Sequence, residues 1–368
     1  MTSLRCFLFA AILLVCAGPA SAGDRYSEPR SCDIPILTAP VCAAQRSWNA
    51  ADAALALGTR DVAGIAEGDV LSVIARRHSG PVTLCCSIDA PLTRIGDSDL
   101  WVLSVRVLGL DRAIIDLQVS PPSPDLAAFY GPQVPRPAAP VRLLGSIVRM
   151  TMHSSVLGEE RRLKIYLPPG CDRRCAVVYL ADGDVVPLYA ETIEAGIVAG
   201  RIRPVILVGL APGMRDPGMR GREYLVGRST PRFRDQMRFV FEEAMPLVER
   251  TYGASDKAAD RMLAGFSDGA AWALAMGLRN RDRVGTVAAL SLGWTQAAAG
   301  VASDDRPRLF LAAGMLEPDF YRVTSQTARR AAGSTAPLRF ESFASGHVLV
   351  AWQTMLLDAL AWSFPRQP

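Results

Sequence analysis

The residues with the clearest capacity for chemistry lie around Ser267. A short apolar run, Met262 to Ala264, is typical of a buried strand; Gly265-Phe-Ser-Asp-Gly269 and an alanine-rich segment of high helix propensity follow it. A strand, a sharp turn and a helix in this order form the setting of a Gly-x-Ser-x-Gly nucleophile elbow. The tight turn leaves no room for a Cβ atom at the flanking positions, so there is a steric reason for both of these residues to be glycine. We therefore predict that Ser267 is a nucleophile at a helix N-terminus, where negative charge is stabilised, rather than part of a plain turn.

A serine hydroxyl needs a base, and the chain has only 3 histidines from which to choose it. His78 stands beside two arginines in the N-terminal part, and His153 lies on an early strand. His347 follows the last predicted strand, a glycine precedes it, and a helix begins directly after it. Because α/β-hydrolases have the chain order Ser, acid, His, we predict His347 as the base, with a surface histidine as the alternative.

The acid that orients this histidine should lie between Ser267 and His347. A predicted strand ends in a loop that carries Glu317 and Asp319, and a side chain just past the carboxyl end of a strand can reach the next loop. Glu317 is the predicted acid, because Pro318 stiffens it and Asp319 resembles the N-cap of the following helix. Asp319 is the fallback.

The tetrahedral intermediate of acyl transfer needs an oxyanion hole. One donor is predicted to be the amide of Asp268, directly after the nucleophile. The other is predicted to be the amide of Gly183 or Asp184, in the loop after an earlier strand. Asp182 and Asp184 also raise the alternative of a metal site, but no histidine or further acid supports one. We predict no metal and no cofactor.

Strands and helices alternate through residues 143–368, the predicted catalytic domain. Several strands are continuous apolar runs, as expected of strands covered on both faces. This alternation indicates a mostly parallel sheet with helices on both sides, so the predicted fold class is α/β. The elbow around Ser267 and the chain order Ser, acid, His make the α/β-hydrolase fold the predicted type. The predicted strands are Ser146–Met152, Arg162–Leu167, Ala176–Leu180, Val205–Leu210, Arg261–Ala264, Thr286–Leu290, Arg308–Ala312 and Leu338–Phe343. The predicted helices are Leu188–Ala199, Phe233–Thr251, Gly269–Leu278, Phe320–Ala332 and Val348–Phe364.

Residues 23–119 have a different pattern, typical of a small antiparallel β-sandwich. Residues 48–57 are rich in alanine and predict either a helix or a covering loop. Residues 120–142 contain seven prolines and no periodicity, so we predict a linker between two domains there. The predicted strands of the N-terminal all-β domain are 69–75, 81–88, 100–108 and 113–119.

Residues 1–22 have the features of a cleaved secretory signal: a positive start at Arg5, an apolar core, and small residues up to Ala22. The apolar run is too short to span a bilayer, so we predict a periplasmic or secreted protein without a membrane span in its mature form. The formal net charge of +4 on 368 residues is small and the basic residues are scattered among acids, so nothing indicates a nucleic-acid partner.

Removal of the signal leaves six of the 8 cysteines, an even number that indicates disulfides in an exported chain. Cys32 with Cys42 and Cys171 with Cys175 are suited to local pairs. The adjacent cysteines 85–86 point to opposite faces of a predicted strand, so a bond between them would be strained. No histidine lies near these pairs, and structural cysteines fit better than a zinc site.

A set of motifs in fixed order resembles the esterase D-like and enterochelin-esterase-like α/β-hydrolases, from about residue 147 to the C-terminus. The resemblance implies a Ser–acid–His hydrolase and favours Glu317 as the acid. Some members also carry an N-terminal immunoglobulin-like sandwich, to part of which residues 98–106 are similar. The motifs are Arg161-Arg-Leu-Lys-Ile-Tyr-Leu-Pro-Pro-Gly170, Tyr179-Leu-Ala-Asp-Gly183, Arg222-Glu-Tyr224, Glu243-Ala-Met-Pro-Leu-Val-Glu-Arg-Thr-Tyr252, Ala264-Gly-Phe-Ser-Asp-Gly269, Ala313-Gly-Met-Leu-Glu-Pro318 and Ser345-Gly-His347.

Asp268 departs from the pattern of this family, in which a neutral residue more often follows the serine. Its carboxylate lies near the charge that must develop, and it raises the barrier unless it points away. Gly269-Ala270 also replaces a frequent Gly-Gly. Arg222, Glu223 and Tyr224 are predicted either to line the substrate pocket or to form a structural ion pair.

The sequence thus predicts an exported serine esterase that hydrolyses a small-molecule ester through Ser267, Glu317 and His347. An acyltransferase, in which a second alcohol outcompetes water, fits the same residues. The third hypothesis is a non-catalytic envelope binding protein, which has no need for all three residue types in the right order. Siderophore lactones, acylated sugars and aryl esters are all compatible with this scaffold.

Overall fold

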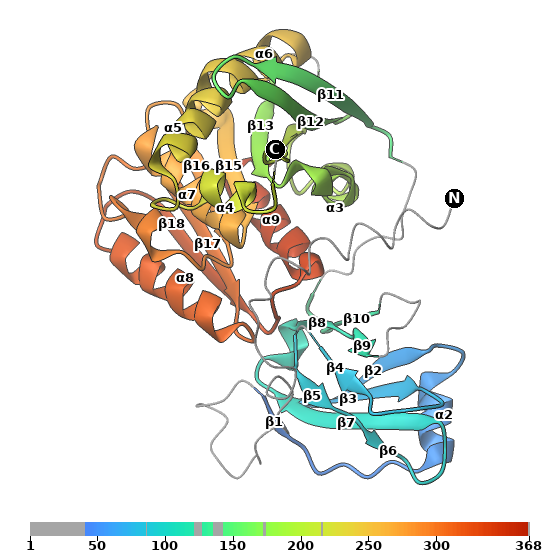
Figure 1. Cartoon of the computed structure of the whole chain (residues 1–368). Coiled ribbons are helices and arrows are strands. Elements are labelled where there is room, and N and C mark those ends of the chain that lie inside the picture. The colour runs from blue at the N-terminus through green and yellow to red at the C-terminus, as the bar shows by residue number, and fades with distance from the viewer. Residues whose placement is uncertain are drawn as a thin grey trace. The chain divides into compact units, whose positions relative to one another are not determined.

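A computed structural model of the chain describes residues 41–85, 87–120, 127–134, 143–171, 174–214 and 216–366 (Figure 1). The described residues form two compact units: one extends to Arg106 and includes Leu117–Ala127, and the other comprises Val107–Asp116 and the residues from Ala128 on. The predicted signal at 1–22, Cys32, Cys86 and most of the predicted linker lie outside the described residues. In the described part of the chain, every helix is too short or too polar to cross a bilayer.

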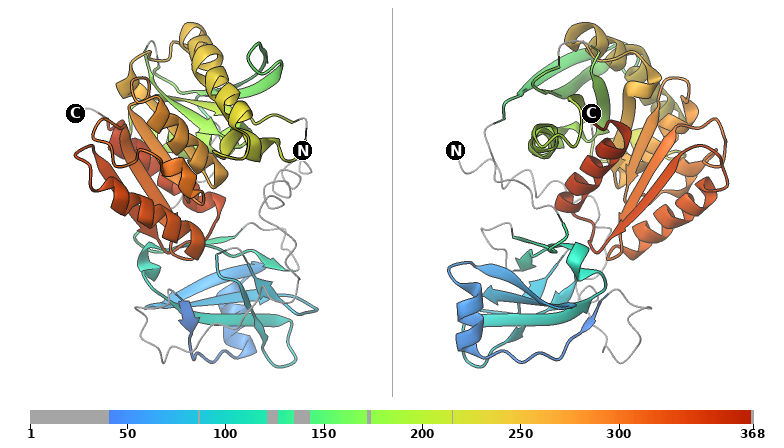
Figure 2. Two further views of the ribbon diagram at one scale, coloured as in Figure 1. Left: turned by 60° about the vertical axis from the view of Figure 1, so that its left-hand side comes forward. Right: turned by 180° about the vertical axis from the view of Figure 1, so that it is seen from behind.

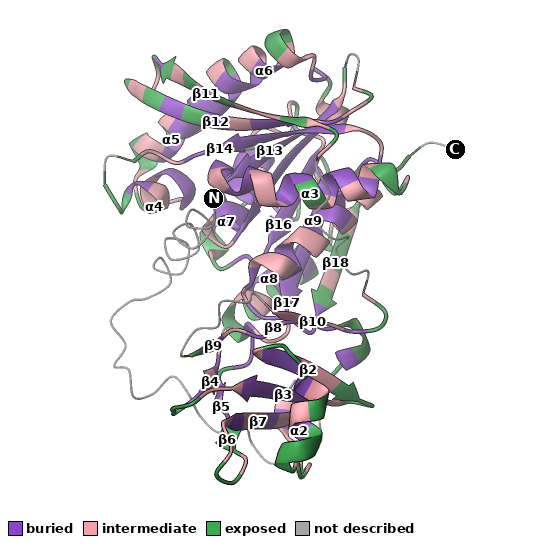
Figure 3. Ribbon diagram, turned by 90° about the vertical axis from the view of Figure 1, so that its right-hand side faces the viewer, coloured by how far each residue is buried: buried purple, intermediate pink, exposed green. Residues whose placement is uncertain are grey.

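An eight-stranded sheet organises the second unit, with the strand order β11-β12-β14-β13-β15-β16-β17-β18. The strands from β14 to β18 in this order are parallel, while β11 and β12 are an antiparallel hairpin at one edge. All eight predicted strands are confirmed, and β13 to β16 are buried along their whole length, as their apolar runs indicated (Figure 3). The strands are β11 (Ser146–Ser154), β12 (Glu159–Leu167), β13 (Ala176–Ala181), β14 (Val205–Leu210), β15 (Arg261–Phe266), β16 (Thr286–Leu290), β17 (Arg308–Gly314) and β18 (Leu338–Phe343).

Helices cover both faces of this sheet (Figures 1 and 2). The connections β13-α3-β14 and β15-α7-β16 step in opposite directions along the sheet, so right-handed crossovers place α3 and α7 on opposite faces. Helix α9 packs beside α3, and α7 buries Trp272 in the main hydrophobic core. The helices are α3 (Val186–Val198), α4 (Met219–Tyr224), α5 (Thr230–Arg238), α6 (Met245–Tyr252), α7 (Asp268–Arg279), α8 (Pro318–Ala331) and α9 (Leu349–Ser363).

Four of the five predicted helices are confirmed as single helices, and the fifth differs. The segment predicted as one helix at 233–251 is α5, a π-helical stretch at Phe239–Ala244 and α6 in succession. Pro246 lacks an amide hydrogen, so the backbone bonding of a regular α-helix is interrupted where α6 begins. The short helix α4 was not predicted, because its six residues carry no periodic apolar pattern.

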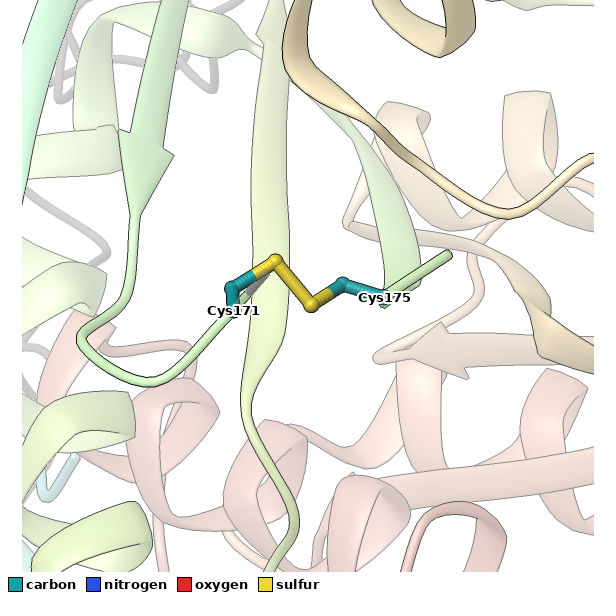
Figure 4. Close-up of a disulfide and its surroundings, with 2 residues drawn as sticks. All are labelled: Cys171 and Cys175. Carbon is teal, nitrogen blue, oxygen red and sulfur yellow. A yellow bond between two sulfur atoms is a disulfide. The ribbon is translucent and has the colours of Figure 1, made fainter. Parts of the chain in front are cut away.

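One predicted disulfide lies at the amino-terminal end of β13. Cys171 and Cys175 are bonded, with their Cα atoms 5.9 Å apart, and this pair is confirmed (Figure 4). The backbone of Cys175 also pairs with residues 253–255, which ties the start of β13 to the segment before β15.

The first unit contains two small antiparallel sheets, ordered β1-β7-β3-β2 with β6 on β7, and β5-β4-β9. Helix α2 packs on β2 and β3, so a helix is the correct alternative for residues 48–57. Strands β3 and β7 match the predictions, whereas the predicted strands 81–88 and 113–119 are reduced to shorter pieces; an immunoglobulin-like sandwich stays a prediction. The elements are β1 (Val41–Ala43), α2 (Ala50–Leu57), β2 (Val62–Glu67), β3 (Val70–Arg76), β4 (Thr83–Leu84), β5 (Ala90–Pro91), β6 (Thr93–Arg94), β7 (Leu100–Val107) and β9 (Val119–Ser120), while β8 (Ile114–Asp116) and β10 (Ala128–Tyr130) pair in the second unit.

Candidate active site

The predicted site residues gather at the carboxyl-terminal edge of the parallel strands. Gly183 follows β13, Ser267 follows β15, Glu317 follows β17 and His347 follows β18. The structure thereby brings residues that are up to 164 positions apart in the chain to one edge of one sheet. Open α/β sheets bind their ligands outside this edge.

Ser267 occupies a strained turn between β15 and α7. Its φ of 57° and ψ of −125° lie in a region that residues other than glycine rarely adopt. A Cβ atom on Gly265 would lie 2.2 Å from the carbonyl oxygen of Gly269, so the turn cannot close with any other residue there. The Ser267 amide donates to the Leu290 carbonyl at 3.0 Å, which fixes the turn against β16.

His347 and Glu317 form a hydrogen-bonded pair. The His347 Nδ1 atom lies 2.5 Å from Glu317 Oε2, and the side chains are 19% and 3% exposed. A proton on Nδ1 shared with the carboxylate leaves Nε2 as the basic nitrogen. Phe320 stacks on the imidazole at 4.0 Å between ring centroids, and Trp352 meets it edge-on at 4.6 Å, so both rings hold its orientation.

The second oxygen of Glu317 has its own buried partners. Oε1 accepts hydrogen bonds from the Ser291 hydroxyl at 2.5 Å and from the Gly314 amide at 2.6 Å, and Trp352 Nε1 donates to Ser291 Oγ at 2.8 Å. Sequence reasoning missed Ser291 and Trp352. The position of Ser291 directly after β16, at the same sheet edge, was the available signal.

Asp319, the fallback acid, has a different partner. Its side chain is 88% exposed and pairs with Arg322. Helix α8 begins at Pro318 with Glu317 at its N-cap, so the prediction that Asp319 is the N-cap was wrong.

The candidate oxyanion amides lie at two helix starts. Asp268 is the first residue of α7, and Gly183 begins a short 3₁₀ helix, Gly183–Val185. The first amides of a helix have no acceptor within it. A Cβ atom on Gly183 would lie 2.3 Å from the backbone of Gly209, so the loop approaches β14 closely only with glycine. Asp184 Oδ1 binds Lys164 Nζ at 2.7 Å.

The carboxylate of Asp268 is held by Arg220, a residue of α4 that sequence reasoning missed. Arg220 Nη1 donates to Asp268 Oδ2 at 2.5 Å, while Nε and Nη2 donate to the two oxygens of Asp182 at 2.7 and 2.8 Å. Burial opposes the charge of Arg220, but the carboxylates of Asp182 and Asp268 outweigh it and raise the pKa of the guanidinium. No spacing rule identifies this arginine.

The predicted substrate-lining residues have different surroundings. Arg222 is 40% exposed and pairs with Asp216. Tyr224 is fully buried; its hydroxyl accepts from the Asp182 amide at 3.0 Å and donates to the Leu210 carbonyl at 3.3 Å. In this conformation Tyr224 supports the loop after β13 and is closed to a ligand. Burial, with the nearby Asp182 carboxylate, raises its pKa well above the usual value.

Glu223, between these two residues, belongs to a buried ion-pair cluster. It is fully buried and binds Arg161 through two hydrogen bonds of 2.8 and 2.9 Å. Arg232 also donates to it. Of the two alternatives predicted for residues 222–224, Glu223 therefore fits the structural ion pair. Within the described residues, no group of three or more His, Cys, Asp or Glu side chains is arranged to hold a metal ion.

Comparison with known proteins gives one family and one fold. Residues 154–363, more than half of the chain, match the model of a family described as "Putative esterase". The enterochelin esterase of Shigella flexneri superimposes with a TM-score of 0.65 at 19% identity, covering 83% of this chain and 95% of that one. The ferric enterobactin esterase of Salmonella typhimurium has a TM-score of 0.65 at 16% identity, with 83% and 97% covered.

A third solved structure, the feruloyl esterase module of Clostridium thermocellum, has a TM-score of 0.52 at 17% identity and covers 63% of this chain and 94% of that one. At these identities the likeness is one of fold. No curated protein sequence matches the chain.

Proposed function

Because the chain belongs to the esterase family that residues 154–363 match, we propose that it is a serine esterase that cleaves small-molecule carboxylic esters through Ser267, Glu317 and His347. Family membership makes the chain a hydrolase of esters. The observation that supports this triad is the 2.5 Å contact between Glu317 and His347 at the sheet edge where Ser267 stands in a strained turn.

The proposed reaction begins with attack of Ser267 Oγ on the ester carbonyl carbon. His347 Nε2 takes the hydroxyl proton, and Glu317 holds the imidazolium through Nδ1. The carbonyl oxygen becomes an oxyanion, which accepts hydrogen bonds from the amides of Asp268 and of Gly183 or Asp184. Collapse of this intermediate breaks the ester bond, and the alcohol leaves with the proton from His347.

The acyl-enzyme is then hydrolysed by the reverse sequence of proton transfers. His347 takes a proton from water, the hydroxide attacks the acyl carbon, and the acid leaves as Ser267 regains its proton. No cofactor takes part. The enterochelin and feruloyl esters named for the structural neighbours are the first natural esters to test.

Export is the second part of this proposal. Residues 1–22 support it through their positive start, apolar core and small residues before Gly23. The disulfide between Cys171 and Cys175 agrees with an oxidising compartment.

Turnover of p-nitrophenyl butyrate by the purified protein tests the proposal. We expect Ser267→Ala and His347→Ala each to lower kcat at least about 1000-fold, because removal of a triad member costs several powers of ten. Circular dichroism should show that both variants keep the fold. A wild type that neither turns over esters nor labels at Ser267 with a fluorophosphonate would favour a non-catalytic binding protein, while transfer of the acyl group to an added alcohol in preference to water would favour an acyltransferase.

A further inference from the structure

The charge of Asp268 poses a problem for the proposed reaction. The residue supplies a candidate oxyanion amide from its backbone, and it carries a carboxylate at the position directly after the proposed nucleophile. A carboxylate opposes the formation of a second negative charge on an adjacent residue, and more strongly where the site is partly buried. The side chain is 32% exposed, so water screens it only in part.

Arg220 places a positive charge against the Asp268 carboxylate. Its guanidinium binds Asp268 with one nitrogen and Asp182 with the other two, and its side chain is 17% exposed. Asp182 directly precedes Gly183, and Asp268 directly follows Ser267. One cation therefore joins the two loops whose amides are the candidate oxyanion donors. The two carboxylates carry a formal charge of −2, and the guanidinium brings the sum for the three side chains to −1.

Helix α4 holds the loop after β13 at a second point. The Tyr224 hydroxyl, one turn after Arg220, accepts the Asp182 amide hydrogen, and the guanidinium lies 5.3 Å from the centre of the Tyr224 ring. Asp182 itself has a left-handed φ of 57°, which a residue with a side chain adopts at some cost. Backbone and side chain of Asp182 are thus both bound from α4, and this restricts the direction of the next amide.

We infer that Arg220 is a positioning residue of the esterase reaction, which aligns the two oxyanion loops through Asp182 and Asp268 and offsets the charge of Asp268. The inference rests on the proposed function. It assigns Arg220 to the protein's own carboxylates rather than to a substrate group. Its loss should therefore lower kcat and leave KM nearly unchanged, because the interaction supports the transition state.

The test compares four variants of the full-length protein with p-nitrophenyl butyrate. Arg220→Met should lower kcat about 100-fold, as loss of an oxyanion donor does, with KM within about threefold of the wild type. Adding Asp268→Asn to it removes one of the two carboxylate charges left without a partner, the one directly after the nucleophile, and should restore kcat about tenfold. Arg220→Lys keeps the charge but not the forked geometry, and should lower kcat about tenfold.

Arg203→Met is the matched control. Arg203 also binds a carboxylate, Asp260, at 2.6 Å and lies over an aromatic ring, that of Phe364, at 5.0 Å. It precedes β14, at the amino-terminal end of the parallel strands and away from the candidate site, so kcat should stay within about twofold of the wild type.

The rate at which a fluorophosphonate labels Ser267 is the second readout, since its transition state also places an oxyanion in the same hole. A wild type that neither turns over p-nitrophenyl butyrate nor labels would refute the proposed function, and with it this inference. If the wild type labels, and folded Arg220→Met and Arg220→Lys both label as fast as the wild type, the role of Arg220 alone would be refuted. A double variant no faster than Arg220→Met would refute the charge compensation.

Discussion

Glu317 shows at the scale of single residues how a buried acid is kept in place. One carboxylate oxygen faces His347, and the other accepts from the Ser291 hydroxyl and the Gly314 amide. A carboxylate that is 3% exposed is costly to bury unless such bonds replace its water. Trp352 donates to Ser291 and also touches the imidazole, so this chain of contacts connects both ends of the pair.

Ser291→Ala tests this support. The change removes one donor to Glu317 and leaves the buried Trp352 Nε1 atom without its acceptor, which should lower the free energy of unfolding by about 1 to 3 kcal/mol. We also expect kcat to fall about tenfold, because Glu317 and the imidazole are then less well aligned. Urea denaturation and p-nitrophenyl butyrate turnover measure the two effects.

Ser255→Ala is the control for this prediction. Ser255 is another fully buried serine that donates to a carboxylate, Asp260, at 2.8 Å, but it lies before β15. It should lose a similar amount of stability and keep kcat. If both variants keep kcat, Ser291 has no role in aligning the acid.

At the scale of elements, strand β15 and helix α7 determine the position of Ser267, the proposed nucleophile. The strand and the helix are joined by one residue, Ser267, and both glycines beside it are packed against backbone or a neighbouring strand. The backbones of Gly183, after β13, and Gly209, in β14, approach each other in a similar way. The site is therefore built on contacts between backbones, which few substitutions can preserve.

Gly265→Ala should break the elbow. Its Cβ atom would lie 2.2 Å from a backbone oxygen that cannot move without α7, so we expect a loss of about 3 kcal/mol or more in the free energy of unfolding. Fluorophosphonate labelling of Ser267 should be lost in the fraction that remains folded, as gel-based probe assays would show.

Gly221→Ala provides the contrast within the same unit. A Cβ atom there meets nothing within 4 Å, and the residue lies inside α4. The variant should be as stable as the wild type or more stable by up to about 1 kcal/mol, with labelling unchanged. Equal behaviour of the two glycine variants would contradict the steric explanation.

At the scale of the whole molecule, ion pairs at the two ends of the large sheet serve different purposes. Arg220 and its carboxylates lie at the carboxyl-terminal edge, beside the site. Asp260 lies at the other edge, where Arg203 and Ser255 bind it at 2.6 and 2.8 Å. Burial opposes the charge of Asp260, but these bonds outweigh it and hold the pKa of its carboxyl below the usual value.

This lowered pKa predicts a pH dependence of global stability. Because the folded protein holds the Asp260 proton less tightly than the unfolded chain, the carboxylate stabilises the fold above its unfolded pKa of about 3.9, and the contribution disappears as the pH falls. The difference in unfolding free energy between wild type and Asp260→Asn should be largest near pH 6 and shrink toward about pH 3. Urea denaturation across this range measures it.

Asp358→Asn should behave in the opposite sense. Burial and the nearby Glu341 raise the pKa of Asp358 despite its bond to Arg201. Its ionisation therefore costs stability as the pH rises. The free energy of unfolding of the variant should increase relative to that of the wild type between about pH 4 and pH 7. Parallel stability curves for all three proteins would contradict both assignments.

The sequence by itself determined the strands of the large sheet, most of its helices, and the places of Ser267, Glu317 and His347 at strand ends. These features depend on near neighbours: apolar runs, a glycine-flanked turn and the alternation of elements, which are all visible along the chain. The pairing of Cys171 with Cys175 was within reach for the same reason.

Only the tertiary structure decided which side chains meet from distant segments. Arg220, rather than Arg222, reaches Asp268, and Ser291 reaches Glu317, because the sheet places the ends of separate strands side by side and α4 lies across two of their loops. Sequence patterns report local periodicity, whereas the partner of a buried charge is selected by distance and by the exclusion of water, which exist only in the folded chain.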